Sequence, residues 1–295
     1  MQIQKRFLVI GAFALVVLLA LIMFWRGVLT GNEDGEQRAT TAGPEGLPVV
    51  TLAKPRKNHN VPDFGAISDI PTRKIEFFSY LLPAINEQNA HILKQRAQIE
   101  RLQQKFERGE ALTAKEQRWL NNLASFYRVN AASEADRFAT LLRRVDIIPD
   151  TLVLIQAANE SGWGTSRFAA DARNFFGQWC WTEGCGLVPA SRGEGQIHEV
   201  REFNSVTESV RSYIRNLNTH DAYQDLRQIR AELRQASLPI TAQPLTHGLM
   251  SYSERGEDYI VELNQMIRVN LPIIREVRES FESNSDHNNQ TASAN

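Results

Sequence analysis

The chain has 295 residues, of which 42% are hydrophobic, and its formal net charge is −1. This is the composition of an ordinary globular protein with appended segments. Because phosphate binding requires a clear excess of basic residues, the near-zero charge argues against nucleic acid as the main partner.

The first predicted element is an uncharged apolar segment at 7–25 (FLVIGAFALVVLLALIMFW), which Lys5 and Arg6 precede. As a helix rising about 1.5 Å per residue it would be roughly 28 Å long, which matches the core of a bilayer. The basic residues in front favour a cytoplasmic N-terminus, so we expect an uncleaved signal anchor over 1–26 and export of the rest. A cleaved signal peptide followed by secretion is the alternative, although the segment is longer than usual for one and no A-x-A site follows closely.

Residues 27–60 are polar, rich in Gly, Thr and Pro, and without hydrophobic period, which predicts a flexible linker. Helical periodicity follows over 61–134, which we interpret as a helical N-terminal extension. Its longest stretch, 71–106, contains Pro83, which should kink or split the helix. The polar stretch at 94–108 is interpreted as a solvated helix face, with a partner-binding helix as the alternative.

Residues 151–158 (TLVLIQAA) are apolar on nearly every side, which predicts a helix buried in a core and capped by Asp150. Gly162 and Gly164 should end this helix, so that Glu160 lies in its last turn. Apolar surroundings and the negative end of the helix dipole would both raise the pKa of Glu160, as a general acid requires. The alternative is a solvent-exposed Glu at an ordinary helix end.

Loop and strand character is clearest over 175–203, where 196–203 alternates as a strand. Ser205 and Glu208 form a capping-box pattern that predicts a helix to about Asn218. Two or three further helices should follow to about residue 270, and the polar tail at 276–295 should be disordered.

The two cysteines, Cys180 and Cys185, would pair across this short loop if the domain lies outside the cytoplasm. Closing so small a ring stabilises by about 2 kcal/mol in the loop-entropy treatment, so the bond would pin a local loop. A metal site is not expected, because two cysteines and a scattered His198 do not make a ligand set.

Three motifs together resemble the family 73 glycoside hydrolases, which are bacterial N-acetylglucosaminidases of the lysozyme-like superfamily. The first is Glu-Ser-Gly-Trp-Gly at 160–164 followed by Ser166, and the second is Asn-Phe-Phe-Gly at 174–177. Three later segments occupy the places of further motifs of the family; they are Val200–Phe203, Glu208-Ser209 and Ser251–Tyr259. The resemblance covers roughly 135–270. It implies a mainly α (α+β) fold, with a lysozyme-like catalytic domain at 135–275 that has a small β-hairpin lobe, preceded by the long helices and the transmembrane helix.

The resemblance implies that Glu160 is the general acid. Glycoside hydrolysis usually needs a second carboxylate, and the family has its second Glu in or beside the hairpin. Glu183, Glu194 and Glu199 are the candidates, with Glu194 preferred, and each is alternatively a surface residue. Tyr252 matches a motif tyrosine that would orient the substrate N-acetyl group or a water molecule, although a core tyrosine is nearly as good an interpretation.

Three residues are candidates for substrate binding. Trp163 offers a flat apolar face for a sugar ring, with core packing as the alternative. Asn174 is expected to hydrogen-bond backbone under the cleft. Trp179 or Trp181 would be a sugar platform, while at least one of the two should only pack.

The expected activity is endo-hydrolysis of the β-1,4 bond after N-acetylglucosamine in peptidoglycan, without a cofactor. The protein would be anchored in the inner membrane through 7–25, with its domain in the periplasm and glycan strands as its partner. A lytic transglycosylase, which needs only one acid/base Glu, is an alternative. A non-catalytic, membrane-tethered wall-binding protein is the other alternative.

Overall fold

The computed structural model describes residues 46–54, 61–190, 192–193 and 195–293, with side chains to residue 284. The predicted anchor at 7–25 and Glu194 lie outside these residues. Within the described ranges, no helix combines the length and the apolar character needed to cross a membrane. All of the described residues belong to one unit, Thr41–Asn295.

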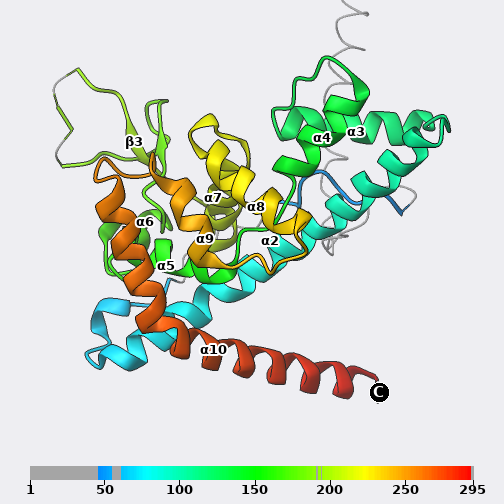
Figure 1. Ribbon diagram of the computed structural model, residues 1–295. Coiled ribbons are helices and arrows are strands. Elements are labelled where there is room, and N and C mark those ends of the chain that lie inside the picture. Colours follow the sequence, from blue (N-terminus) through cyan, green and yellow to red (C-terminus); the bar gives the residue numbers. More distant parts are fainter. Residues whose placement is uncertain (1–45, 55–60, 191, 194, 294–295) are drawn as a thin grey trace, which may run out of the picture. The chain divides into compact units, whose positions relative to one another are not determined.

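Helices make up most of this unit (Figure 1), which confirms the predicted mainly α class. The α-helices are α2 (Ile70–Glu107), α3 (Ala114–Phe126), α4 (Glu134–Arg144), α5 (Asp150–Ser161), α6 (Arg167–Ala172), α7 (Val206–Thr219), α8 (Gln224–Gln235), α9 (Ala242–Thr246) and α10 (Glu257–Ser293). Short 3₁₀ turns are η2 (Phe64–Ala66), η3 (Asp221–Tyr223) and η4 (His247–Leu249). The strands are β1 (Trp179–Cys180), β2 (Gly186–Leu187) and β3 (Glu199–Arg201).

Helix α2 organises the unit. It begins after Asp69, whose carboxylate accepts a hydrogen bond from the Thr72 N–H at 2.9 Å, and it continues through Pro83 without interruption. A kink or a split was predicted at Pro83, and the split is therefore wrong. In Figure 1, α2 crosses the unit diagonally, and its buried face packs against α5, α7 and α10. The segment at 61–134 consequently shares one hydrophobic core with 135–275 instead of forming a separate extension.

Part of the predicted linker at 27–60 is docked on this core. Residues 46–54, which we call the strap, lie along α2 and α3. Leu47 is buried, and the Pro48 carbonyl accepts a hydrogen bond from Trp119 Nε1 at 2.6 Å. The side chain of Gln95 donates to the carbonyls of Val49 and Val50. These hydrogen bonds hold the strap in place. Residues 46–54 are therefore not part of a flexible linker, in contrast to the prediction.

The β lobe is a three-stranded antiparallel sheet in the order β1-β3-β2. The predicted strand at 196–203 is shorter than expected, since only Glu199–Arg201 forms ladder bonds. Its neighbours contribute two residues each, with Trp179 opposite Val200 and Gly186 opposite Arg201. The predicted small β lobe is present, with three short strands in place of a simple hairpin.

Two predicted helix starts differ in detail. Pro149 is the N-cap of α5, while Asp150 is already helical and its carboxylate pairs with Arg278 of α10. Ser205 caps α7 as predicted, but the Glu208 carboxylate accepts from the N–H of Asn204, one residue before the cap. Both carboxylates lie in the first turn of their helix, where a negative charge interacts favourably with the helix dipole and stabilises the helix.

Helix α10 continues into the region predicted to be a disordered tail, 276–295, as far as Ser293. It runs from Glu257 to Ser293, and Ile274 and Val277 are buried against the unit. The polar composition after Phe281 is compatible with helix because the helix has already been started by packed residues, and adding a residue costs less than nucleation.

Candidate active site

Glu160 lies in the last turn of α5, as predicted. This helix is buried along almost its whole length, and Gly162 ends it in the left-handed conformation at φ 56°. The hydroxyl of Ser161 donates to the Ala157 carbonyl at 2.6 Å and accepts from the Gly164 N–H at 2.8 Å. The turn that follows Glu160 is therefore held by buried hydrogen bonds, and the carboxyl has a defined position at the edge of the core.

Residues of the N-terminal segment pack directly on this turn. A Cβ atom at Gly164 would lie 2.4 Å from the ring of Phe64, so only glycine fits there. Trp163 packs edge-on against Phe77 and Phe78, with the Lys74 ammonium 4.9 Å above its ring. These contacts support the core-packing alternative for Trp163, because the ring is engaged by α2 and only partly exposed.

A chain of hydrogen bonds leads from the core to the Glu160 carboxyl group. The hydroxyl of Tyr259, on α10, donates to Glu160 Oε1 at 2.9 Å. Gln156 Nε2 donates to the Tyr259 oxygen at 2.9 Å, and the hydroxyl of Tyr213 donates to Gln156 Oε1. Gln156 and Tyr213 are fully buried, so this chain fixes the carboxyl group through partners that have little freedom.

The pKa of Glu160 lies above its usual value. Burial is the main cause, and the negative charge of Glu262 on α10 adds to it. Hydrogen bonds from Tyr259 and Asn159 act in the opposite direction. The predicted direction is confirmed, with burial as its cause, and such a carboxyl group keeps part of its proton at a higher pH than an exposed Glu.

The Asn-Phe-Phe-Gly turn lies on the other side of the carboxyl group. A Cβ atom placed on Gly177 would be 3.9 Å from Glu160 Oε2, so this backbone borders the second carboxylate oxygen. The buried Asn174 side chain donates to the carbonyls of Gln178 and Arg201 and accepts from the Gln178 N–H. This is the backbone role predicted for Asn174, and it leaves little of its amide for direct substrate contact.

Tyr252 holds the same turn. Its hydroxyl donates to the Phe176 carbonyl at 3.1 Å, and its ring stacks on that of Tyr259 with centroids 5.6 Å apart and planes 6° apart. The motif tyrosine therefore positions its neighbours Phe176 and Tyr259. Its contacts support the packing alternative more than direct orientation of a substrate.

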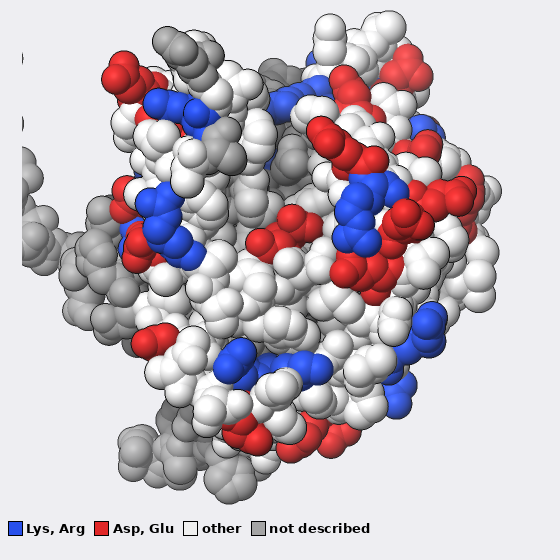
Figure 2. All heavy atoms as spheres, turned by 90° about the vertical axis from the view of Figure 1, so that its left-hand side faces the viewer, with Lys and Arg blue, Asp and Glu red and all other residues white. Residues whose placement is uncertain are grey.

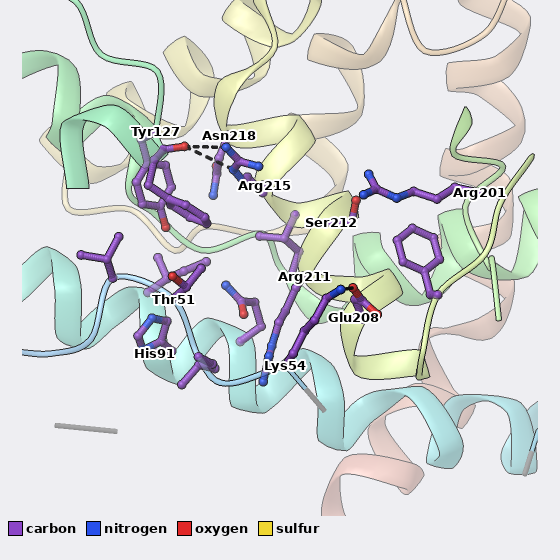
Figure 3. A pocket seen from close by; sticks show the side chains of 17 residues that line it. Thr51, Lys54, His91, Tyr127, Arg201, Glu208, Arg211, Ser212, Arg215 and Asn218 are labelled. Atoms are coloured by element: carbon purple, nitrogen blue, oxygen red, sulfur yellow. Dashed lines mark hydrogen bonds and ion pairs between the residues drawn. The ribbon is translucent and has the colours of Figure 1, made fainter. Parts of the chain in front are cut away.

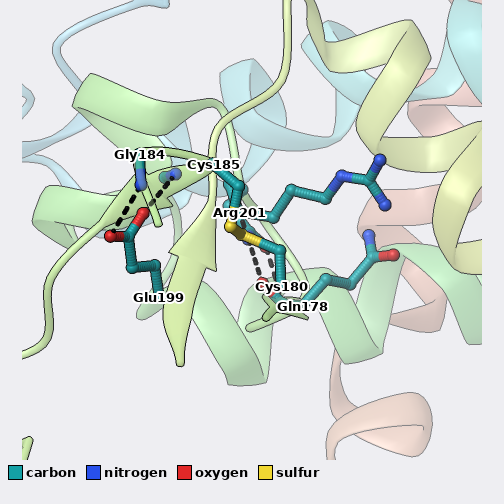
Figure 4. The surroundings of a disulfide bond; sticks show 8 residues. Gln178, Cys180, Gly184, Cys185, Glu199 and Arg201 are labelled. Carbon is teal, nitrogen blue, oxygen red and sulfur yellow. Dashed lines mark hydrogen bonds between the residues drawn. A yellow bond between two sulfur atoms is a disulfide. The ribbon is translucent and has the colours of Figure 1, made fainter. Parts of the chain in front are cut away.

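The three candidates for the second carboxylate have different surroundings. Glu199 is buried and accepts from the N–H groups of Gly184 at 3.0 Å and Gly186 at 2.8 Å (Figure 4), and these bonds hold its pKa below the usual range. Glu183 is exposed in the adjoining loop, and Glu194 lies outside the described residues. Glu199 is thus used to shape the loop.

The disulfide between Cys180 and Cys185 closes this loop, as predicted (Figure 4). The two sulfur atoms and the Glu199 carboxylate lie close together. They are not a set of metal ligands, because the sulfurs are bonded to each other and the carboxylate accepts two backbone N–H groups.

Large aromatic side chains flank the disulfide. Trp179 is 53% exposed and Trp181 is 63% exposed, and the Trp179 ring stacks on His198 with centroids 4.3 Å apart and planes 8° apart. They line a broad depression together with Phe168, Ile197 and other residues of the β lobe. Such an exposed, supported indole is suited to stacking on a sugar ring, which is the role predicted for Trp179.

The face that carries the β lobe and the start of α10 is hollowed between two rims (Figure 2). Lys, Arg, Asp and Glu side chains are all present on these rims, without one sign prevailing. A mixed surface of this kind is suited to a polar polymer of modest charge better than to a polyanion.

Comparison with known proteins gives the same assignment as the motifs. A family model described as glucosaminidase, mannosyl-glycoprotein endo-beta-N-acetylglucosaminidase, matches residues 135–270. Protein Bax of Escherichia coli (strain K12) is 37% identical over 220 residues, which are 74% of this chain and 77% of the relative. The chain belongs to the Bax-like family of glucosaminidase-domain proteins. No solved structure matches the chain.

This Bax-like chain therefore carries a domain of the glycoside hydrolase type, which acts on glycans. The match ends at residue 270 and begins at 135, whereas the core that supports Glu160 also includes α2. The relative is similar over a longer stretch than the family model, in agreement with a folded unit larger than 135–270.

Four residues around Glu160 were not assigned a role from the sequence: Gln156, Tyr213, Tyr259 and Glu262. Tyr259 was visible as the last residue of the Ser251–Tyr259 motif. The position of Glu262, three residues later on α10, places it on the same helix face as Tyr259. Gln156 stands within the apolar run at 151–158. A polar amide in a run that is expected to be buried is itself a signal, because a buried amide needs hydrogen-bond partners.

Proposed function

We propose that this protein hydrolyses the β-1,4 glycosidic bond after N-acetylglucosamine in peptidoglycan, with Glu160 as general acid. The observation that carries the proposal is the half-buried Glu160 carboxyl group, whose pKa is raised by burial and whose Oε1 is held by Tyr259. A general acid needs a proton at working pH and a fixed direction in which to deliver it.

The hydrogen bonds suggest how the proton is delivered. Because Oε1 accepts from Tyr259, the acidic proton is carried by Oε2, the oxygen that faces Gly177. Glycine at 177 leaves space beside this oxygen for a glycosidic oxygen. As the bond to the leaving sugar breaks, negative charge develops on Glu160, and the hydrogen bond from Tyr259 becomes stronger.

The sugar chain would lie across the hollowed face, with one ring on Trp179 or Trp181. Glu194 stays the proposed second carboxylate, since Glu199 is engaged by Gly184 and Gly186. Whether the product keeps or inverts the anomeric configuration depends on the distance between the two carboxyl groups. The protein is further proposed to be held in the inner membrane by 7–25, or secreted after cleavage, with peptidoglycan as its partner in the periplasm.

A lytic transglycosylase is the second candidate, and one observation favours it. Among the described candidates for a second carboxylate, Glu199 is engaged in backbone hydrogen bonds and Glu183 is exposed. A transglycosylase needs only the acid/base residue, because the 6-hydroxyl of the sugar takes the place of the attacking water.

The products distinguish these activities. Purified sacculi are incubated with the full-length protein in detergent, or with its Glu160→Gln variant, and the released material is analysed by mass spectrometry. Reducing N-acetylglucosamine ends that are absent with the variant support the hydrolase, whereas 1,6-anhydro ends support the transglycosylase. Release of nothing by a folded protein that still binds sacculi would instead favour a wall-binding role.

A further inference from the structure

We propose that Gln156 is a positioning residue that fixes the direction of the hydrogen bonds leading to Glu160 and so places the acidic proton of Glu160 on Oε2. Gln156 lies on α5, four residues before Glu160, and its side chain is completely buried. It acts on Glu160 through Tyr259. The use of this proton in catalysis rests on the proposed function, whereas the direction of the hydrogen bonds does not.

The amide of Gln156 stands between two tyrosine hydroxyl groups. Tyr213 of α7 donates to Gln156 Oε1, and Gln156 Nε2 donates to the Tyr259 oxygen at 2.9 Å. Because the Tyr259 oxygen receives a hydrogen there, its own hydrogen points to its other neighbour, Glu160 Oε1, at 2.9 Å. The oxygen and the nitrogen of an amide have opposite roles in hydrogen bonds, so the orientation of this amide decides in which direction all three bonds run.

A Gln156 amide turned by half a rotation would reverse these roles. Its Oε1 would accept from Tyr259 and draw that hydrogen away from Glu160, while its Nε2 would face the Tyr213 oxygen. The hydrogen of the buried Tyr213 hydroxyl would then lose its acceptor, and a buried donor without a partner is costly. Tyr213 therefore holds the amide in the orientation that directs the Tyr259 hydrogen to Glu160.

The ring of Tyr213 has little freedom to follow a turned amide. It is 1% exposed, and it stacks on Phe176 with centroids 4.0 Å apart and planes 12° apart. It also lies edge-on to Tyr252, with an angle of 70° between the planes. The close packing of these rings fixes the place of the hydroxyl group beside Gln156.

Helix α7, which carries Tyr213, is held on its far side as well. Residues two apart on an α-helix are rotated by about 200°, so Arg211 and Arg215 lie on the face opposite Tyr213. There they line a cavity beside the strap (Figure 3). Arg211 donates to the Ala53 carbonyl at 2.7 Å, and Arg215 donates to the Phe126 carbonyl at 3.0 Å. The helix is thus a fixed support for the first hydroxyl of the chain.

The direction of the bonds decides which oxygen of Glu160 is protonated. Oε1 receives the Tyr259 hydrogen, so a proton is taken up by Oε2, beside Gly177. In the reversed arrangement a proton on Oε1 would be donated to the Tyr259 oxygen and would point into the core. The carboxyl group would hold that proton more tightly, because it gains a buried hydrogen bond, and could not present it to a glycosidic oxygen.

Titratable side chains from α7, η3 and 252–262 interact electrostatically with Glu160; they are Tyr213, Tyr223, Tyr252, Tyr259 and Glu262. Burial raises the pKa of each of the four tyrosines above its usual value, so all four stay neutral at neutral pH. Glu262 is the charged member of this group, and it pairs with Arg255 at 2.6 Å. A reversal of the hydrogen bonds would therefore change the pKa of Glu160 without changing the charges around it.

Tyr213→Phe tests the proposal, because it removes the hydroxyl that is farthest from Glu160 in the chain. Gln156 is then free to turn, and the protonated form of Glu160 gains the reversed arrangement. The pKa of Glu160 should rise, with its proton dissociation constant lowered about two- to tenfold. Tyr223→Phe is the matched control, since it removes a buried hydroxyl from the same group of aromatic rings but outside the chain.

The pKa is followed by ¹³C NMR of the full-length protein in detergent, labelled at the carboxyl carbon of glutamate. The signal of Glu160 is identified by its absence in Glu160→Gln. We expect the pKa to rise in Tyr213→Phe and to stay in place in Tyr223→Phe. A pKa that is unchanged or lower in Tyr213→Phe, or that rises equally in Tyr223→Phe, would overturn the proposal.

A double variant tests whether the effect passes through Gln156. Adding Gln156→Met to Tyr213→Phe removes the amide oxygen that a turned Gln156 would offer to Tyr259. The Tyr259 hydrogen should then return to Glu160, and the pKa of Glu160 should fall back toward that of the parent. Because both polar partners are replaced by apolar side chains of similar size, the fold should be retained. A pKa that stays as high as in Tyr213→Phe would refute the role of Gln156.

Activity separates this inference from the proposed function. Tyr213→Phe should slow the digestion of sacculi about two- to tenfold and move the alkaline limb of the pH–rate profile to higher pH, because part of the protonated Glu160 points into the core. If the pKa of Glu160 follows the expected order while the pH–rate profile does not, Gln156 positions the proton as inferred and Glu160 is not the general acid. That result would overturn the proposed function alone.

Discussion

The hydroxyl of Tyr259 donates a hydrogen bond to Glu160 Oε1 at 2.9 Å across 99 residues of sequence. This bond joins the end of α5 to the beginning of α10. It favours the ionised form of Glu160, in opposition to burial, which favours the protonated form. The balance between the two decides at which pH the carboxyl group loses its proton. Influences that lower and that raise this pKa can be changed separately, by substitution of Tyr259 and of Glu262.

Removing the hydroxyl in Tyr259→Phe should raise the pKa of Glu160, because a hydrogen bond to the charged form is lost. For a general acid, activity declines as the pH rises through its pKa. The alkaline limb of the pH–rate profile for sacculus digestion should therefore move to higher pH. A limb that stays in place, or moves to lower pH, would contradict the role given to Tyr259.

Glu262→Gln should have the opposite effect. The negative charge of Glu262 raises the pKa of Glu160, so neutralising it lowers that pKa and moves the alkaline limb to lower pH. Glu257→Gln, an exposed carboxylate at the start of α10, is the control and should leave the limb unchanged. A similar shift in both variants would mean that the effect reflects general surface charge.

Glu160→Gln should reduce the rate of glycan cleavage by at least about 100-fold, the usual contribution of a general acid, while binding to sacculi is retained. It should also raise the melting temperature at pH 7. A carboxyl group with a raised folded-state pKa contributes stability at low pH and loses it as the pH rises through that pKa. The difference in melting temperature should therefore disappear below the ordinary pKa of Glu, and a constant difference would argue against this cause.

Glu199→Gln should lower stability at neutral pH, because the charged carboxylate accepts from the N–H groups of Gly184 and Gly186. Its pKa is depressed, so its contribution is present above the unfolded pKa and is lost as the pH falls through the folded pKa. Thermal unfolding of the variant and the parent should converge in acid. Glu183→Gln, in the same loop and exposed, is the control that should unfold like the parent at every pH.

The strap can be tested by truncation. A chain that begins at residue 61 lacks the buried Leu47 and leaves the side chains of Gln95 and Trp119 without their backbone acceptors. We expect it to unfold at a clearly lower temperature than a chain that begins at residue 46, because each buried donor left unsatisfied costs about 1–3 kcal/mol. Equal melting temperatures would show that the strap adds nothing to stability.

Local features of this protein followed from the sequence because they depend on neighbouring residues. An apolar run closed by glycines predicted α5 and the position of Glu160, and the short spacing of Cys180 and Cys185 allowed their pairing. The same local reasoning failed where packing outweighs propensity. Pro83 stays within a continuous helix whose neighbouring residues are buried on both sides of it, and the polar end of α10 continues a helix that packed residues begin.

Composition, the C-terminal end of α5 and the acidic motif were thus determined by the sequence itself, since they reflect the chemistry of residues within a few positions of each other. Tertiary structure alone decided which distant groups meet: Tyr259 and Glu262 at Glu160, and the strap on α2. Hydrophobic periodicity reports that a helix face is buried, but not what lies against it. The environment of the candidate acid depends on these partners, because burial and nearby charges set its pKa.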